Sequence, residues 1–174
     1  MGPHYLSRFF TPKSVAIVGA SERQDSVGYR LLLNMKEAGF TGGLYPVNPK
    51  HEQLLGLKAY PDLNAIPEDL DLAVIATPAA TVPGIVRQCG EKNVTSVIII
   101  SAGFVERDAE GKRLQQELLD IAHRYGIRII GPNCLGVICP GGRLNASFAD
   151  GSVKDGNLAL LSQSGAVCTA ILDW

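Results

Sequence analysis

The chain has 174 residues, of which 46% are hydrophobic and 19% charged, and its formal net charge is −1. This composition is typical of a globular protein with one core of ordinary size, or of one domain with part of another. The near-neutral charge gives no electrostatic reason to expect nucleic acid or a membrane surface as a partner, and no apolar run approaches the ~20 residues that span a bilayer. Because the N-terminus lacks a signal-peptide core, we expect a cytoplasmic protein.

The cysteines are expected to be reduced thiols. Cys89, Cys134, Cys139 and Cys168 include no C-x-x-C pair, and a chain without a secretory signal has little use for disulfides. Cys134 and Cys139 lie close together in the sequence, but no histidine or further cysteine pair completes the four ligands of a zinc site. No metal is therefore predicted.

Apolar strands alternate with amphipathic helices along the chain. The first half of the chain is expected to contain a short helix within residues 1–13, a strand at 14–19, a helix at 26–38 that Gly39 ends, a short strand at 43–47 and irregular pieces at 54–71. A strand at 72–76, a helix from 82 that Gly90 ends, a strand at 96–100, a helix at 109–125 between Asp108 and Gly126, and a strand at 127–130 are expected next. The last part is expected to contain an irregular segment at 136–156, a strand at 157–161 and a helix that begins near 164. Pro46 favours an edge position for the strand at 43–47.

This alternation predicts an α/β fold, in which a parallel sheet is covered by helices on both faces. Residues 1–135 are expected to form one Rossmann-like domain and 136–156 a connection. Residues 157–174 are expected to form the first strand and the start of the first helix of a truncated second domain.

The turns that follow the strands are the candidate site. Right-handed crossovers place these turns at the carboxyl edge of the sheet, where ligands bind. The five turns are Gly19-Ala20-Ser21, Asn48-Pro49-Lys50, Thr77-Pro78-Ala79, Ser101-Ala102-Gly103 and Gly131-Pro132-Asn133.

The first turn departs from the G-x-G-x-x-G pattern of dinucleotide-binding proteins, because Ser21 stands where the second glycine would be. Its amides, the Ser21 hydroxyl and the N-terminus of the following helix can still cradle a pyrophosphate. A purely structural tight turn is the alternative interpretation.

The second turn favours a phosphorylated ribose. An NAD-binding domain carries an acid after its second strand, whereas this chain has Asn48 and Lys50 there and no acid before Glu52. A cation at this place suits the 2′-phosphate of NADP or the 3′-phosphate of coenzyme A, and a solvated surface lysine is the alternative. An NADP-binding domain of an oxidoreductase is therefore one candidate function.

Six short motifs follow one another along the chain. They are Val18-Gly19-Ala20-Ser21, Val47-Asn48-Pro49-Lys50 followed by Leu55-Gly56, Ala76-Thr77-Pro78-Ala79, Ser101-Ala102-Gly103-Phe104, Gly131-Pro132-Asn133-Cys134-Leu135-Gly136 and Ser162-Gln163-Ser164-Gly165. In this order they resemble the CoA-binding domains of the succinyl-CoA synthetase α-subunit superfamily. The closer resemblance is to the NDP-forming acyl-CoA synthetases, which include ADP-forming acetate–CoA ligases and related protein lysine acetyltransferases.

The resemblance implies coenzyme A as the ligand and a flavodoxin-like second domain. It assigns the CoA phosphates to the first turn and to Lys50 with its neighbours Asn48 and Pro49. It assigns the flank of the nucleotide to the third turn, and the CoA path to the fourth turn and Asn133. Ser162, Ser164 and Gly165 would begin a helix whose N-terminus faces a phosphohistidine in the family.

The resemblance also implies that ligation needs parts outside these residues. The histidines are His4, His51 and His123, and none lies in a glycine-rich loop. We therefore expect the chain to bind CoA without ligase activity and without catalytic residues of its own, while ATP or ADP binds to the remaining domains or to a β subunit.

Two further functions are alternatives. One is a stand-alone CoA-binding regulatory module. The other, a hydrolase with Ser164 as nucleophile, lacks the glycine that its elbow motif needs at position 162. The acyl substrate, the choice of ADP or GDP and the association of copies of the chain are left open by the sequence.

Overall fold

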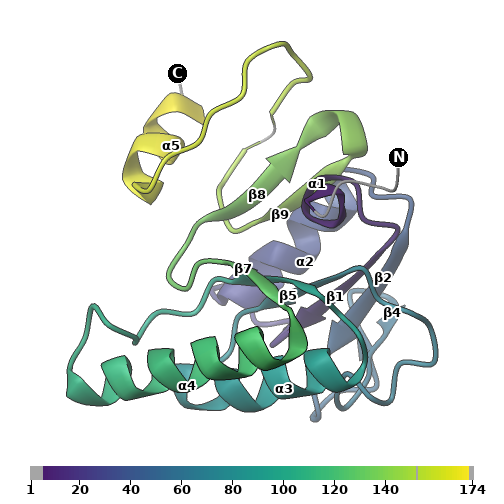
Figure 1. Ribbon diagram of the computed structural model, residues 1–174. Helices are drawn as coiled ribbons and strands as arrows, with labels where there is room; N and C mark the ends of the chain where they lie inside the picture. Colours follow the sequence, from purple (N-terminus) through teal and green to yellow (C-terminus); the bar gives the residue numbers. More distant parts are fainter. Residues whose placement is uncertain (1–5, 152, 173–174) are drawn as a thin grey trace, which may run out of the picture.

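The structure, a computed structural model, describes residues 6–151 and 153–172. Five parallel strands form one sheet in the order β2-β1-β5-β6-β7, with helices on both faces (Figure 1). The strands are β1 (Ser14–Val18), β2 (Gly43–Val47), β5 (Leu72–Ile75), β6 (Ser96–Ile99) and β7 (Arg128–Ile130). The expected α/β fold with a parallel sheet is confirmed. Residues 1–5 of the predicted lead-in and 173–174 of the predicted last helix lie outside the described residues.

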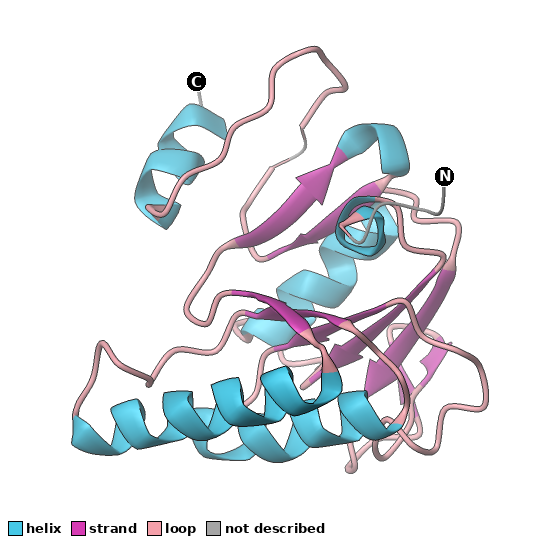
Figure 2. Cartoon of the chain, in the orientation of Figure 1, coloured by secondary structure: helices cyan, strands magenta, loops and turns pink. Residues whose placement is uncertain are grey.

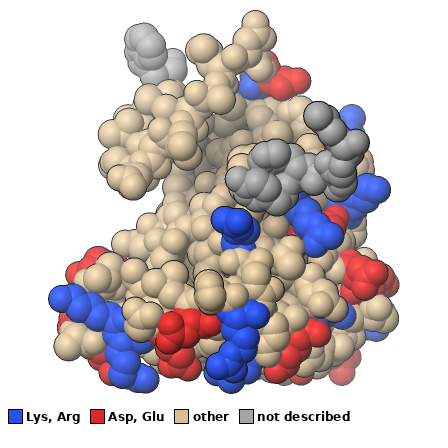
Figure 3. All heavy atoms as spheres, in the orientation of Figure 1, with Lys and Arg blue, Asp and Glu red and all other residues tan. Residues whose placement is uncertain are grey.

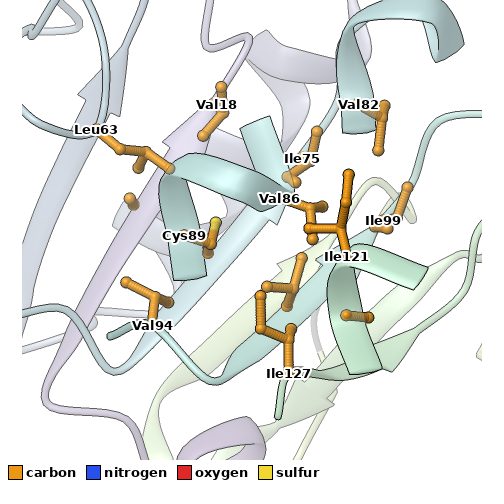
Figure 4. Close-up of a cluster of buried hydrophobic side chains, with 14 of the residues drawn as sticks. Val18, Leu63, Ile75, Val82, Val86, Cys89, Val94, Ile99, Ile121 and Ile127 are labelled. Carbon is orange, nitrogen blue, oxygen red and sulfur yellow. The ribbon is translucent and has the colours of Figure 1, made fainter. Parts of the chain in front are cut away.

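Helices cover both faces of the sheet (Figures 1 and 2). The short α1 (Ser7–Phe10) and α2 (Val27–Glu37) lie on one face, and α3 (Val82–Glu91) and α4 (Ala109–Tyr125) lie on the other. Because successive strand residues point to opposite faces, β1 contributes Val15 and Ile17 to the core under α2. Ala16 and Val18 join the core under α3 and α4, where Val86, Cys89 and Ile121 are also packed (Figure 4).

Capping residues fix the ends of the two longest helices. Ser26 Oγ accepts a hydrogen bond from the Tyr29 amide at 3.2 Å, and Asp108 Oδ1 accepts one from the Gly111 amide at 2.8 Å. Gly126 ends α4 in the left-handed conformation, with φ 65°. The predicted starts and stops of these helices are therefore confirmed.

Gly90 does not end α3, which corrects the sequence prediction. The helix continues to Glu91, and Asn93, with φ 60°, provides the left-handed residue after it. A Cβ at Gly90 would lie 2.2 Å from Cγ of Tyr125. The glycine therefore permits the close approach of α3 and α4.

After the edge strand β2, the chain forms a small hairpin. As Pro46 predicts, β2 is the outermost strand on its side. The antiparallel pair β3 (Gln53–Leu54) and β4 (Leu57–Lys58) follows it in the sequence. Tyr60 then forms a parallel bridge with Val47, so that the chain returns along the outer side of β2.

Residues 136–147 are not irregular, which corrects a second prediction. They form an antiparallel hairpin of β8 (Gly136–Cys139), the 3-10 turn η2 (Pro140–Gly142) and β9 (Leu144–Ser147). Leu144 and Ala146 of β9 are buried in the core that contains α2. The buried Asn34 of α2 donates its amide hydrogens to the carbonyl oxygens of Ser147 and Ala149, at 2.8 and 2.9 Å.

The strand predicted at 157–161 is absent from the described residues, whereas the helix after Ser164 is present. Leu158 and Leu161 are 100% and 99% exposed. Ser164 Oγ accepts a hydrogen bond from the Val167 amide at 3.3 Å and so caps α5 (Gly165–Leu172), of which no described residue is buried.

Charged side chains gather over α3 and α4, while the lobe that carries α5 is almost free of them (Figure 3).

No helix among residues 6–151 and 153–172 combines the length and apolar character needed to cross a membrane.

Candidate functional site

A groove of about 810 Å³ lies at the carboxyl ends of β1, β2 and β5. It is bounded by the first turn, the start of α2, the turn after β2 and the start of α3. The predicted site residues that line it are Gly19, Ser21, Asn48, Pro49, Lys50, Thr77 and Pro78. The structure thus brings the first three predicted turns together in one groove.

The other predicted residues of the sheet edge do not line the groove. Ala20 is buried, and Ala79 and Ala102 lie outside the groove lining. Ser101 Oγ accepts a hydrogen bond from the Thr77 amide at 3.1 Å, and the Ser101 carbonyl accepts one from the Asn133 amide at 2.9 Å. A Cβ at Gly103 would lie 3.2 Å from Cβ of Ala79. The fourth turn therefore contacts the third turn directly, and the fifth turn is hydrogen-bonded to the fourth, so both position the third turn without lining the groove.

Two glycines shape the part of the groove at the start of α2. Gly19 has φ 90°, and a Cβ at Gly28 would lie 1.9 Å from the Gly19 carbonyl oxygen. This contact allows α2 to begin directly against the first turn. The first amides of a helix have no partner within the helix, and the first turn of α2 contains no acidic residue. The positive end of the helix dipole therefore faces the groove and favours an anion.

The sequence analysis missed the role of Gly28. The available signal was its position, as the next glycine after Gly19 and on the first turn of the predicted helix. Val27, Pro61, Ile85 and Gln88 also line the groove without having been predicted. Val27 begins α2, Ile85 and Gln88 lie within α3, and Pro61 lies in an irregular segment. Periodicity does not distinguish a ligand contact at such positions from packing or surface exposure.

The turns are fastened to each other by side chains. Asn48 Nδ2 donates to the carbonyl oxygen of Ala20 at 2.8 Å, and Asn48 Oδ1 accepts from the Lys50 amide at 2.9 Å. Ser21 Oγ accepts from the Arg23 amide at 3.0 Å. Asn48 therefore positions the first and second turns, and its own polar atoms are already bonded. The Lys50 side chain is exposed and forms no ion pair with another described residue.

Away from α2 the groove also has apolar surface, beside polar residues such as Asp62, Thr81 and Gln88. Pro49, Pro61, Pro78 and Ile85 line this part. Proline rings are rigid, so they offer contact area to the planar ring of a nucleotide base with little loss of side-chain entropy. The groove therefore combines an anion-binding end with a surface suited to a nucleotide base.

The thiol at this edge of the sheet is not an activated nucleophile. Burial raises the pKa of Cys134 to about 11, and its Sγ donates to the Ile99 carbonyl oxygen at 3.3 Å. Since the thiolate is the reactive form, Cys134 stays a protonated packing residue near neutral pH. Glu106 has a structural role, because the Gly103 amide donates to its carboxylate at 2.6 Å and lowers its pKa.

The serines before α5 do not line the groove. The Ser164 amide donates to Ser162 Oγ at 3.0 Å, and a Cβ at Gly165 would lie 3.9 Å from Cβ of Leu135. Within residues 6–151 and 153–172, no three His, Cys, Asp or Glu side chains gather so as to hold a metal ion.

The sequence model of the CoA binding domain family matches residues 13–140, which include the whole five-stranded sheet and the groove. The chain belongs to the CoA-binding domain family. The 174-residue chain is 44% identical over 169 residues to acetate–CoA ligase [ADP-forming] I of Archaeoglobus fulgidus. It is 46% identical over 168 residues to the α subunit of acetate–CoA ligase [ADP-forming] II of Pyrococcus furiosus. These matches cover 97% and 96% of the chain but 24% and 36% of the relatives.

Solved structures show the same fold. A dinucleotide-forming acetyl-coenzyme A synthetase 1 of Candidatus Korarchaeum cryptofilum, in complex with phosphate and ADP, superposes with a TM-score of 0.91 at 40% identity. The superposition covers 97% of the 174-residue chain and 36% of the synthetase chain. The fold and the family are thus shown, and the chain spans well under half the length of these relatives. No comparison supports the NADP-binding alternative.

Proposed function

We propose that the chain binds coenzyme A in the groove, as the CoA-binding portion of an NDP-forming acyl-CoA synthetase. The full reaction would be acyl-CoA + NDP + phosphate ⇌ acid + CoA + NTP. The observation that carries this proposal is the Gly19–Gly28 contact, which places the N-terminus of α2 at one end of a groove that has Lys50 on its rim. Such a helix end favours a pyrophosphate, and a cation near the ribose favours a phosphorylated one.

Each part of the groove then has a role. The amides of Gly19, Ser21 and the start of α2 hold the pyrophosphate. Pro49 and Pro78 flank the adenine, and the Lys50 ammonium faces the 3′-phosphate. Ser101 and Asn133 act indirectly, since their hydrogen bonds position the turn that carries Thr77.

We infer that phosphoryl transfer belongs to other parts of the full protein. His51 lies beside Lys50, and His123 lies on α4, away from any glycine-rich loop. We infer a CoA-binding domain at 1–135, with the hairpin at 136–147 of the predicted 136–156 connection packed onto it, and the start of a second domain at 157–174. In that second domain the N-terminus of α5, with Ser162 and Ser164, would face a phosphorylated group, and ATP or ADP would bind elsewhere.

The similar proteins favour a ligase over a protein acetyltransferase. The relatives named above are acetate–CoA ligases and an acetyl-coenzyme A synthetase. Another is a 4-hydroxybutyrate–CoA ligase [ADP-forming] of Nitrosopumilus maritimus, 40% identical over 169 residues. Since the acyl groups of these relatives differ, the CoA-binding residues do not define the acyl substrate.

A titration of Lys50→Ala tests the proposal. An exposed ion pair contributes up to about 1 kcal/mol, so we expect CoA to bind about five-fold more weakly and dephospho-CoA to bind with nearly unchanged affinity. Isothermal titration calorimetry of the 174-residue chain with both ligands measures this difference.

The matched control is Lys112→Ala, an exposed lysine on α4 outside the groove, which should leave both affinities unchanged. Equal losses for CoA and dephospho-CoA in Lys50→Ala would remove Lys50 from the 3′-phosphate. Failure of the unaltered chain to bind CoA would overturn the proposed function itself.

A further inference from the structure

A second hollow of about 640 Å³ adjoins the groove on the outer side of β2. We call it the lysine recess, since Lys50 and Lys58 both line it, together with His51 and Glu52. Pro49 and Lys50 line the recess and the groove alike. The two hollows therefore form one continuous surface around the turn after β2.

The surplus of positive charge lies in the lysine recess. There, two lysines stand against the single carboxylate of Glu52. The groove lining has two basic residues, Arg23 and Lys50, and two acidic ones, Asp25 and Asp62, and Asp25 Oδ1 lies 2.9 Å from Arg23 Nε. Lys50 is shared by both hollows, so Lys58 is the additional positive charge of the recess. A phosphomonoester carries about −1.5 to −2 charges at pH 7, so it is attracted to the recess more strongly than to the rest of the groove.

Hydrogen bonds tie the hairpin that carries Lys58 to the loop before α2. The Leu55 amide, in the turn between β3 and β4, donates to Glu22 Oε1 of the first loop at 3.1 Å. The Ala59 amide donates to the Glu52 carbonyl oxygen at 2.8 Å, which closes the other end of the hairpin. Lys58 Nζ lies 5.0 Å from the ring centroid of the buried Tyr60. This contact orders the ammonium group before any ligand arrives.

We propose that Lys58 joins Lys50 in binding the 3′-phosphate of CoA in the lysine recess, and so acts as a second specificity-determining residue. This inference rests on the proposed CoA binding. With the pyrophosphate at the start of α2, a ribose bound beside the turn after β2 would lie next to Lys50, whose side chain also lines the recess. Two ammonium groups on one phosphate would discriminate CoA from dephospho-CoA more strongly than Lys50 alone.

Calorimetric titration of Lys58→Gln with CoA and dephospho-CoA tests this role. We expect the affinity for CoA to fall about five-fold, and the affinity for dephospho-CoA to stay within two-fold of the unaltered chain. Lys58→Arg, which keeps the charge, should retain the discrimination. Lys112→Gln on α4 is the matched control, because it removes an exposed lysine far from both hollows.

The outcomes separate this inference from the proposed function. If the unaltered chain binds CoA but Lys58→Gln has no effect, or weakens both ligands equally, Lys58 does not contact the 3′-phosphate and CoA binding still stands. If the unaltered chain binds neither ligand, both proposals fail. A loss confined to CoA supports both.

Discussion

Among single residues, Gly28 is as important to the site as any residue that faces the ligand. Its hydrogen sits against the Gly19 carbonyl oxygen, and a methyl group there would overlap that oxygen at 1.9 Å. Because the overlap is with backbone, a larger residue must push α2 away from the first turn. The cradle that we propose for the pyrophosphate would then open.

We predict that Gly28→Ala destabilises the chain by about 1–3 kcal/mol, the usual cost of overpacking, and weakens CoA binding more than ten-fold. Urea denaturation and calorimetry measure the two effects. Gly84→Ala is the matched control, since Gly84 lies in α3 with no atom within 4 Å of an added Cβ. That change should stabilise the helix by up to about 1 kcal/mol and leave CoA binding alone. Wild-type affinity in Gly28→Ala would contradict the assigned role.

Some residues of the groove can be predicted from the sequence, and others cannot. Gly19 and Lys50 follow predicted strands, so their place at the sheet edge could be inferred from connectivity alone. Ser101 follows a predicted strand too, yet its hydroxyl bonds to the Thr77 amide and does not line the groove. Which side of a turn faces the ligand depends on tertiary hydrogen bonds, which spacing in the sequence does not reveal.

Among the elements, α2 links the groove to the β8–β9 hairpin. Its N-terminus forms the cradle, and its middle carries Asn34, whose amide group reaches the carbonyl oxygens of Ser147 and Ala149. Asn34 is only 4% exposed. These two hydrogen bonds join segments more than a hundred residues apart, so they fix the hairpin to α2.

Asn34→Ala should therefore destabilise the chain by about 1–3 kcal/mol, because two buried carbonyl oxygens lose their donor. Gln116→Ala is the control: Gln116 is an exposed α4 residue that bonds only to the neighbouring Asp120, and its loss should change stability by less than about 0.5 kcal/mol. Denaturant titration of both variants makes the comparison. Equal effects would show that Asn34 does not hold the hairpin.

Element prediction succeeded where local signals agreed. Ser26, Asp108 and Gly126 marked helix ends correctly, because caps are local chemistry. The β8–β9 hairpin escaped prediction because β9, Leu144–Ser147, has no continuous apolar run and follows a glycine-rich turn. Its burial comes from α2, far away in the sequence. Gly90 was misread because a glycine that permits helix packing looks the same in sequence as one that ends a helix.

Over the whole molecule, residues 7–149 form a packed unit and residues 157–172 do not. The predicted strand at 157–161 had the right apolar composition, but a strand needs a neighbour to bond with, and the described residues provide none. Leu158 and Leu161 are consequently exposed, as are Val167 and Ile171 of α5.

Hydrogen exchange should report this contrast directly. We predict that the amides of Leu158, Leu160 and Leu161 exchange near the rate of an unprotected chain, while those of Val97 and Ile98 in the buried β6 are strongly protected. The sample must be a demonstrated monomer, because a second copy could cover the apolar tail. Strong protection of the tail amides in a monomer would contradict the structure described for this segment.

The central claim is that this α/β chain binds coenzyme A, and that its groove recognises the phosphorylated nucleotide of that ligand. Calorimetric titration of the 174-residue chain with CoA, compared with NADP under the same conditions, tests it most directly. The account predicts saturable binding of one CoA per chain, with a lower Kd than for NADP. Tighter binding of NADP, or no binding of CoA, would contradict it.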